Sequence, residues 1–522
     1  MVHSNTNLDY DAIVIGAGIS GLYQLYKLRE LGLTVRVFER GTGVGGTWYW
    51  NRYPGARFDS ESYSYAYSFS QELLDEWDWS EHFASQPEIL RYLQHVADKF
   101  DLLKNIQFSS DVRSAVYDDD TRSWEIRLEN GNTYRSMFLI TGVGILSEPT
   151  LPKIKGIQSF KGQSFHTSRW PHIPVNFAGK KVAVIGTGAT GVQTIQEVSK
   201  EVGHLTVFQL RPEWCAPLHN SKIGPDEMKV IRNGYDEMFE RCAQTRAGFI
   251  HTADHRGTFE VSAKERYEFW EQLYASPGFG IWQGNFKDVG TDPEANKAMS
   301  DFLADKIRGR VNNPILAEKL TPKDHGFGTR RVPLETNYYD TPIERVTQNG
   351  ILTTDKEFEF DFIIYATGFD AIFGSYNRID IRGVNQRRLK DQWEEELATF
   401  LGFQTKGFPN LFMIMGPHAM QGNNPRNIEY NVEWITDVIK YMNDHGLTRA
   451  EASSESQNGW HEYVLEQGKD LLMTQVDSWF TGINSNIEGR QTRITAMYRG
   501  SMQSFRNRCE EAAQNGYKEL WS

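Results

Sequence analysis

Two glycine-rich loops are the residues of this sequence whose types and spacing most clearly specify chemistry. One reads Gly-Ala-Gly-Ile-Ser-Gly at 16–21, and the other reads Gly-Thr-Gly-Ala-Thr-Gly at 186–191. In a G-x-G-x-x-G loop, the first glycine permits a tight turn, the second lets a pyrophosphate approach the backbone, and the third lets helix and strand pack closely. Unpaired N–H groups at the helix N-terminus then attract the phosphates. Two such loops predict two dinucleotide cofactors with electron transfer between them.

The sequence around each loop predicts the strands and the helix that must position it. Residues 10–15 and 33–38 are short apolar runs rich in β-branched side chains, and apolar residues recur at helical spacing between them. The same pattern returns with the runs 181–185 and 205–209 around the second loop. A lone glycine pattern is weak evidence, but a loop inside a βαβ unit predicts a nucleotide site.

The two units differ at the position that contacts the ribose. Glu39 lies 18 residues after Gly21 (39 − 21), where a carboxylate accepts hydrogen bonds from ribose hydroxyls. The same spacing after the second loop reaches Gln209, with Arg211 just beyond it. Because arginine pairs with a 2′-phosphate that a carboxylate would repel, the first site fits FAD and the second fits NADP(H). Glu213 nearby leaves open that Arg211 is a solvated loop charge.

Three further segments carry residues suited to flavin chemistry. Segment 45–59 combines a glycine pair, three consecutive aromatic residues, Arg and Pro, which predicts a rigid loop with flat surfaces beside an isoalloxazine ring. A packed aromatic loop without a ligand is the alternative. Segment 160–171 reads F-x-G-x-x-x-H-x-x-x-W-P, and segment 328–331 reads Gly-Thr-Arg-Arg. Adjacent arginines are usually surface charge, so spacing alone leaves the role of 328–331 open.

Taken together, these segments resemble Baeyer–Villiger monooxygenases, flavoenzymes that insert one oxygen atom of O2 beside a ketone carbonyl. Segment 160–171 resembles the family signature, 45–59 resembles a second one, and 328–331 resembles the family's G-T-[KR]-R. The likeness covers almost the whole chain. It implies FAD and NADP as cofactors, a small-molecule ketone and O2 as substrates, and an ester or lactone formed by way of a C4a-peroxyflavin. Related N- and S-oxygenases usually end the first signature in Tyr or Phe followed by Lys, which disfavours them here.

The resemblance also implies roles for individual residues. Arg331 is the expected catalytic cation over the flavin, and Asp59 is the carboxylate that orients it. Arg330 is expected at the NADP 2′-phosphate, and Trp479 against NADP where it closes the substrate pocket. His166 is expected on the linker between the nucleotide domains, where it governs their relative motion rather than acting as an acid or base.

The cofactor-binding residues expected from the loops and the resemblance form one set. They are Gly16, Gly18, Ser20, Gly21, Glu39, Thr47, Trp48, Trp50, Arg57, Asp59, Tyr65, Val112, Gly186, Thr187, Gly188, Ala189, Thr190, Gly191, Gln193, Arg211, Arg330, Arg331, Asn424 and Trp479. No metal site is expected.

Two departures from the family pattern stand out. Leu210 intervenes between Gln209 and Arg211, which predicts a displaced or weakened grip on the 2′-phosphate. Asp340 runs through Thr341 directly into Pro-Ile-Glu-Arg at 342–345, where relatives carry roughly a dozen more residues. This short connection predicts a rearranged sheet edge near the FAD domain, and it keeps an uncoupled NADPH oxidase open as an alternative beside a flavin-dependent N- or S-oxygenase.

The predicted fold class is α/β, with two Rossmann-like dinucleotide-binding domains and a mainly helical insertion in the NADP domain. The expected domains are an FAD-binding domain at 1–145 and 343–522, an NADP-binding domain at 146–219 and 326–342, and the insertion at 220–325. The apolar run 360–366, followed by Thr367 and Gly368, is expected to rejoin the sheet of the first domain. It marks a close backbone approach to a cofactor or to the other domain.

Composition narrows the remaining classes. The 522 residues include 68 acidic and 56 basic side chains, a net charge of −12 without an extended basic run, which disfavours nucleic-acid binding. We expect no membrane span and no signal peptide, because no apolar run is long enough. The three cysteines form no C-x-x-C pair, which argues against a disulfide reductase and for a cytoplasmic protein. Oligomeric state is not indicated.

Overall fold

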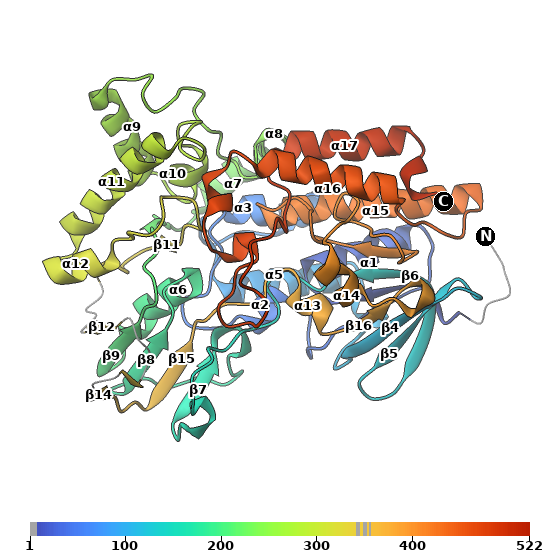
Figure 1. Cartoon of the computed structure of the whole chain (residues 1–522), viewed down its shortest axis with the longest axis horizontal. Helices are drawn as coiled ribbons and strands as arrows, with labels where there is room; N and C mark the ends of the chain where they lie inside the picture. The colour runs from blue at the N-terminus through green and yellow to red at the C-terminus, as the bar shows by residue number, and fades with distance from the viewer. Residues whose placement is uncertain (1–7, 341–344, 348–351, 354–355, 522) are drawn as a thin grey trace.

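A computed structural model describes residues 8–340, 345–347, 352–353 and 356–521. Two sheets lie side by side in Figure 1, and each contains the strand that directly precedes one of the glycine loops. A helical region covers one end of the second sheet (Figure 1). None of the helices in these ranges is long and apolar enough to cross a bilayer.

The first sheet has β1 at its centre, directly before the first glycine loop. Its order is β16-β4-β5-β6-β1-β2-β3, and β17 pairs with the end of β6. Strands β4 to β6 form an antiparallel meander, whereas β1, β2 and β3 run parallel. The strands are β1 (Tyr10–Ile15), β2 (Val35–Phe38), β3 (Ile106–Gln107), β4 (Val112–Asp118), β5 (Ser123–Leu128), β6 (Thr133–Thr141), β16 (Asp380–Arg382) and β17 (Leu411–Met413).

Helices from both ends of the chain cover this sheet. Figure 1 shows the C-terminal helices α15, α16 and α17 stacked over α1. Tyr23 and Gln24 of α1 donate hydrogen bonds to Glu433 and Thr436 of α15, at 2.9 and 3.1 Å. The helices are α1 (Ile19–Glu30), α2 (Thr47–Trp50), α3 (Ser62–Tyr65), α4 (Gln71–Glu76), α5 (Gln86–Lys99), α13 (Gly374–Asn377), α14 (Leu389–Glu395), α15 (Asn424–His445), α16 (Ser454–Gly468) and α17 (Met502–Gln514).

The second sheet is parallel, in the order β12-β9-β8-β15-β7. Its strands are β7 (Gln163–His166), β8 (Lys181–Ile185), β9 (His204–Phe208), β12 (Arg345–Thr347) and β15 (Phe362–Tyr365). Two small pairs lie outside it: β10 (Ala216–Pro217) with β11 (Leu334–Glu335), and β13 (Leu352–Thr353) with β14 (Lys356–Glu357).

The prediction that the run 360–366 rejoins the first sheet is wrong. Strand β15 lies between β8 and β7 of the second sheet, and the first sheet resumes only with β16, so its domain does not restart at residue 343. An apolar run buried on both faces suits the centre of either parallel sheet, and its late position in the chain does not distinguish them. The other domain limits stay a prediction.

The chain therefore crosses between the sheets twice, and the two crossings pair with each other. Thr150 on the outward crossing receives and donates hydrogen bonds with Thr367 and Gly368 on the return. The N–H of Ile372 donates to the carbonyl of Ile145 at 2.7 Å. The close approach expected at Thr367 and Gly368 is thus a contact between the two inter-sheet segments.

The short connection predicted after Asp340 lies outside the described residues. Strand β12, which follows it, forms the edge of the second sheet beside β9. Any rearrangement caused by the missing residues therefore concerns the NADP-side sheet, whereas the sequence suggested the FAD side.

Six helices occupy the range 220–325, and no strand lies between β10 and β11. Helices α9, α11 and α12 begin at side-chain caps, namely Ser262, Asp292 and Asn313. Helices α7 and α8 place Met228 and Tyr235 in the apolar core of the first domain, whereas α9 to α12 pack on the core of the second. The helices are α7 (Pro225–Asn233), α8 (Tyr235–Gln244), α9 (Ala263–Ala275), α10 (Gly280–Gln283), α11 (Pro293–Arg310) and α12 (Pro314–Leu320).

Backbone contacts fix the second glycine loop. Gly186 has φ = +105°, and a Cβ there would collide with the carbonyl oxygen of Ala366 at the end of β15. A Cβ on Gly191 would collide with the carbonyl oxygen of Gly186. Helix α6 (Ala189–Val198) can therefore approach β8 only while both positions are glycine.

We expect Gly191→Ala to lower the free energy of unfolding by about 1–3 kcal/mol, because the added methyl group overpacks the contact between α6 and β8. Thermal unfolding followed by circular dichroism measures it. The control is Gly309→Ala in α11, where the glycine is exposed and nothing lies within 4 Å of an added Cβ. This control should be neutral or stabilising by about 0.5–1 kcal/mol. Equal melting temperatures for the two variants would contradict the packing argument.

Candidate active site

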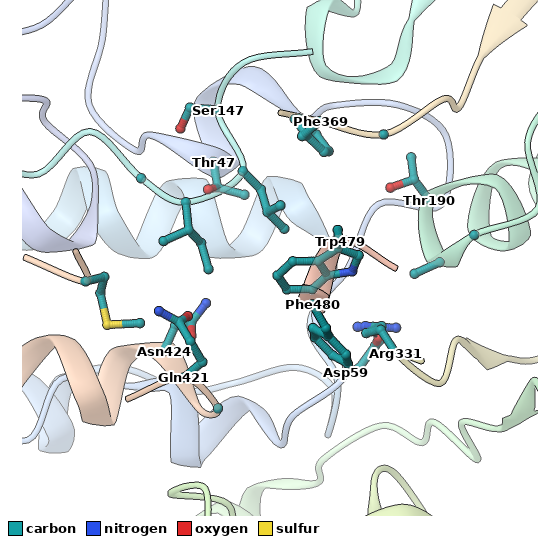
Figure 2. A pocket seen from close by; sticks show the side chains of 18 of the residues that line it. Thr47, Asp59, Ser147, Thr190, Arg331, Phe369, Gln421, Asn424, Trp479 and Phe480 are labelled. Atoms are coloured by element: carbon teal, nitrogen blue, oxygen red, sulfur yellow. The ribbon is translucent and has the colours of Figure 1, made fainter. Parts of the chain in front are cut away.

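A cavity of about 1420 Å3 is lined by both glycine loops, by the segment around α2, by the helical insertion and by the C-terminal loop. Figure 2 shows Trp479 in the middle of it, with Arg331 on one side and Gln421 and Asn424 on the other. Every residue that the sequence assigned to a cofactor or to catalysis lines this cavity except Gly21 and Gly191. These two glycines act instead by letting helix and strand pack.

On the first-loop side, Glu39 is positioned to read a ribose. Its carboxylate accepts hydrogen bonds from the N–H of Ala17 at 2.8 Å and of Gly41 at 2.6 Å, and only 5% of the residue is exposed. Burial raises the pKa of this carboxyl, while the two backbone donors lower it. Each carboxylate oxygen keeps a lone pair for a ribose hydroxyl, so the site fits FAD.

The aromatic segment after this loop is a short helix rather than an irregular loop. Trp48 donates a hydrogen bond from Nε1 to the hydroxyl of Tyr65 at 3.1 Å. The guanidinium carbons of Arg40 and Arg169 lie 5.0 and 4.9 Å from the ring centroid of Trp50. The contact of Trp50 with a cofactor stays a prediction, as do those of Thr47, Tyr65 and Val112.

Arg331 and Asp59 form an ion pair at the centre of the site, and Asp59 is 4% exposed. Gln193 of α6 fixes Asp59 from the second domain, because its Nε2 lies 3.4 Å from Asp59 Oδ1 and 3.1 Å from the carbonyl oxygen of Arg57. The hydroxyl of Tyr53 donates to Gln193 at 2.8 Å. Gln193 was expected at a cofactor, and the structure adds this bridging contact.

Arg57 is held by contacts within the protein. Its guanidinium pairs with Glu81 at 3.2 Å and donates to the carbonyl of Phe83 at 3.1 Å. These contacts tie the loop of Arg57 to the segment 81–83, and because Arg57 also borders the cavity, its contact with a cofactor stays a prediction.

The predicted 2′-phosphate cations are both paired with carboxylates. Arg211 lies 3.5 Å from Asp324, and its carbonyl accepts a hydrogen bond from the Thr187 hydroxyl at 3.0 Å. Arg330 lies 3.6 Å from Asp324 and 3.5 Å from Glu213. The two guanidinium groups converge at the edge of the second loop, which fits a 2′-phosphate, but that phosphate must compete with two carboxylates.

The C-terminal loop brings Trp479 into the cavity. Ser478 caps the short turn that holds it, and Asn484 donates to the carbonyl of Phe369 at 2.9 Å. The rings of Trp479 and Phe480 lie 4.4 Å apart. The loop is thereby tied to the returning inter-sheet segment.

His166 ends strand β7 and is 8% exposed. Its Nδ1 accepts a hydrogen bond from the N–H of Ser168 at 3.1 Å. Burial lowers the pKa of His166 to about 4, so the ring is neutral at pH 7. The ring centroid of Trp170 lies 5.3 Å from that of Phe165, which belongs to β7. These contacts give the fingerprint an evident structural role on the NADP-side sheet.

Sequence reasoning missed cavity residues that no motif marks. Phe279 of the insertion lies 5.4 Å from the guanidinium carbon of Arg331, and Gln421 faces the cavity beside Asn424. Arg246 and Arg499 also line it. Isolated residues in unrelated segments leave no spacing signal, so only the fold brings them together.

Comparisons with known proteins agree with this geometry. Residues 11–245 match the flavin-binding monooxygenase-like family. The chain is 44% identical, over 97% of each sequence, to 2-oxo-Delta(3)-4,5,5-trimethylcyclopentenylacetyl-CoA monooxygenase from Pseudomonas putida. It is 37% identical to a Baeyer–Villiger monooxygenase from Pseudooceanicola batsensis, over 98% of this chain and 96% of that one. A crystal structure of OTEMO with FAD and NADP superposes with a TM-score of 0.93, at 44% identity over 98% of this chain and 99% of that one.

The chain belongs to the Baeyer–Villiger monooxygenases. It is an FAD- and NADPH-dependent flavoprotein that oxidises ketones to esters or lactones. The predicted α/β fold with two Rossmann-like domains is confirmed. The buried Glu39 carboxylate beside the first loop and the paired arginines beside the second are the features of this monooxygenase that fit the two cofactors.

We expect Asp324→Asn to lower the KM for NADPH about two- to fivefold, because Arg211 and Arg330 lose a competing carboxylate. The KM for NADH should change less, since NADH carries no 2′-phosphate. Steady-state oxidation of both coenzymes measures the ratio of the KM for NADPH to the KM for NADH. Glu318→Gln, which removes a nearby carboxylate paired with Arg308, is the control. A ratio of KM values that stays at the wild-type level in Asp324→Asn would refute the competition.

Proposed function

We propose that Arg331, held by Asp59, is the catalytic cation of ketone oxidation in this monooxygenase. The observation that carries the proposal is their ion pair, which lies in the cavity shared by both glycine loops. Arginine stays protonated at any physiological pH, so it offers a permanent charge. A cation fixed in advance stabilises negative charge where it develops without a cost of reorganisation.

The surroundings of the pair support this role. Asp59 receives Arg331 on one carboxylate oxygen and Gln193 on the other, which fixes the carboxylate from two sides. Phe279 presents its ring to the guanidinium. FAD, when bound and reduced by NADPH, would activate O2 for attack on the ketone carbonyl. Arg331 would then stabilise the anionic oxygen that this attack produces.

Trp479 and Phe480 would exclude water from the same space. Their rings pack against each other at a tilt and are carried by a short turn that Ser478 caps. Excluding water strengthens the field of Arg331 and prevents the activated oxygen from being lost as hydrogen peroxide. We also infer a cytoplasmic protein, since all three cysteines are free and buried.

We expect Arg331→Ala to keep bound FAD but to lose ester formation by about a hundredfold or more, because the developing oxyanion loses its cation. Cyclopentanone under 18O2 is the assay, with lactone measured by mass spectrometry and one labelled oxygen expected in each product molecule. FAD content per chain is measured in the same preparation.

Arg308→Ala, an exposed arginine of α11 paired with Glu318, is the matched control and should keep wild-type yield. Normal lactone yield from Arg331→Ala would remove Arg331 from catalysis. Hydrogen peroxide as the sole product of the wild-type protein, with several ketones offered, would favour an uncoupled oxidase. Oxygen transfer to an amine or sulfide alone would favour an N- or S-oxygenase.

A further inference from the structure

Two arginines from distant segments meet on the wall of the cavity. Arg246 follows helix α8, and Arg499 precedes helix α17. The guanidinium of Arg246 donates from Nη2 to the carbonyl of Arg499 at 3.2 Å. The N–H of Met502 donates to the carbonyl of Arg246 at 2.8 Å. The backbone thus fixes the two side chains next to each other.

These arginines differ from the other cations of the cavity in having no carboxylate partner. Among the described residues, no ion pair is formed by Arg246 or Arg499, whereas every other arginine or lysine on the cavity wall has one. The paired residues are Arg40 and Arg169 with Glu148, Arg57 with Glu81, Arg211 with Asp324, Lys287 with Glu260, Arg330 with Glu213, Arg331 with Asp59, Arg378 with Asp111, and Arg490 with Asp370.

The protein holds this charge at a cost. Burial, and then the charge of Arg246, lower the pKa of Arg499 to about 10. Neighbouring protein atoms likewise lower the pKa of Arg246 by partial desolvation, although the residue as a whole is exposed. Both stay protonated at pH 7, so two like charges face one space without an anion to balance them. Such an arrangement is unfavourable until an anion binds.

Arg499 is also linked to the reaction site. Its guanidinium carbon lies 4.7 Å from the ring centroid of Phe480, and its Nη2 donates to the carbonyl of Phe480 at 3.1 Å. The ring of Phe480 packs at a tilt against that of Trp479, next to Arg331 and Asp59 in the view of Figure 2. An anion held by the two arginines would therefore sit beside the aromatic wall of the pocket.

We propose that Arg246 and Arg499 bind an anionic group, a carboxylate or a phosphate, carried by the ketone substrate. The inference rests on the proposed ketone oxidation and narrows its substrate class from ketones in general to anionic ketones. One end of the substrate is anchored by charge-assisted hydrogen bonds, and its carbonyl is presented toward Arg331. The 2′-phosphate of NADP has other predicted cations, Arg211 and Arg330, beside the second loop.

The first test compares three substrates that share one ring. They are (2-oxocyclopentyl)acetate, its neutral methyl ester and its coenzyme A thioester. We expect the wild-type kcat/KM to be at least about tenfold higher for an anionic substrate than for the methyl ester at low salt. The preference should fall as NaCl is raised, because salt screens the arginines. A preference for the free acid identifies a carboxylate as the anion, and a preference for the thioester identifies a phosphate.

The second test removes each cation. In Arg246→Gln and Arg499→Gln, the preference for the anionic ketone over the methyl ester should fall about tenfold. The loss should appear mainly as a higher KM for the anionic ketone, and the KM for NADPH should not change. Lysine at either position should restore part of the preference. Arg241→Gln removes an exposed arginine of α8 and should keep the wild-type preference. Should the glutamine variants fail to fold, the lysine variants and the salt dependence of the wild type still decide.

Several results would overturn the inference. An equal or higher kcat/KM for the methyl ester, or a preference unchanged in both glutamine variants, would remove the anion site and leave ketone oxidation standing. A rise in the KM for NADPH without any change in preference would assign the arginines to the coenzyme. Failure of all three ketones would overturn the proposed function instead. Binding of the free acid to the oxidised holoenzyme, read from the flavin absorbance, would then decide the anion site separately.

Discussion

The ion pair between Asp59 and Arg331 is the interaction on which the arrangement of the site depends. It joins segments 272 residues apart in sequence, one after the first glycine loop and one after the helical insertion. Gln193 adds a contact from the second nucleotide unit. Because a buried carboxylate left without its partner is strongly destabilising, the pair keeps these elements together as well as placing a cation in the cavity.

Around this pair, almost every arginine or lysine on the cavity wall lies within ion-pair distance of a carboxylate. Glu148 pairs with three arginines on the FAD side, and Asp324 pairs with two on the NADP side. Carboxylates placed in this way reduce the repulsion between the guanidinium groups, so that many of them can line one cavity. This arrangement also makes the unbalanced pair Arg246 and Arg499 conspicuous, since nothing in the described protein replaces the missing anion.

The two inter-sheet crossings explain how the halves of the site stay in register. The outward and returning segments are joined by backbone hydrogen bonds at Thr150 and Ile145, and the C-terminal loop is tied to the same strip through Asn484. The loop that carries Trp479 is thus bound to the returning inter-sheet segment. That segment begins just after β15, at Ala366, whose carbonyl lies against the second glycine loop. A displacement of the second sheet would be transmitted to the aromatic wall of the pocket through these contacts.

The sequence determined the parts of this protein whose physics is local. A βαβ unit with glycines at fixed offsets is specified by its own residues, so both nucleotide loops and the ribose-side Glu39 could be predicted from spacing. The family resemblance added Asp59, Arg330, Arg331 and Trp479, which line the same cavity as the loops.

Only the tertiary structure decided features that depend on partners far away in the chain. Strand β15 was predicted in the wrong sheet because an apolar run does not encode its neighbours. The pairing of Arg57 with Glu81, the competition of Asp324 for Arg211, and the meeting of Arg246 with Arg499 have the same cause. A charged side chain acquires its role from which opposite charge the fold places beside it, and no spacing in the sequence records that choice.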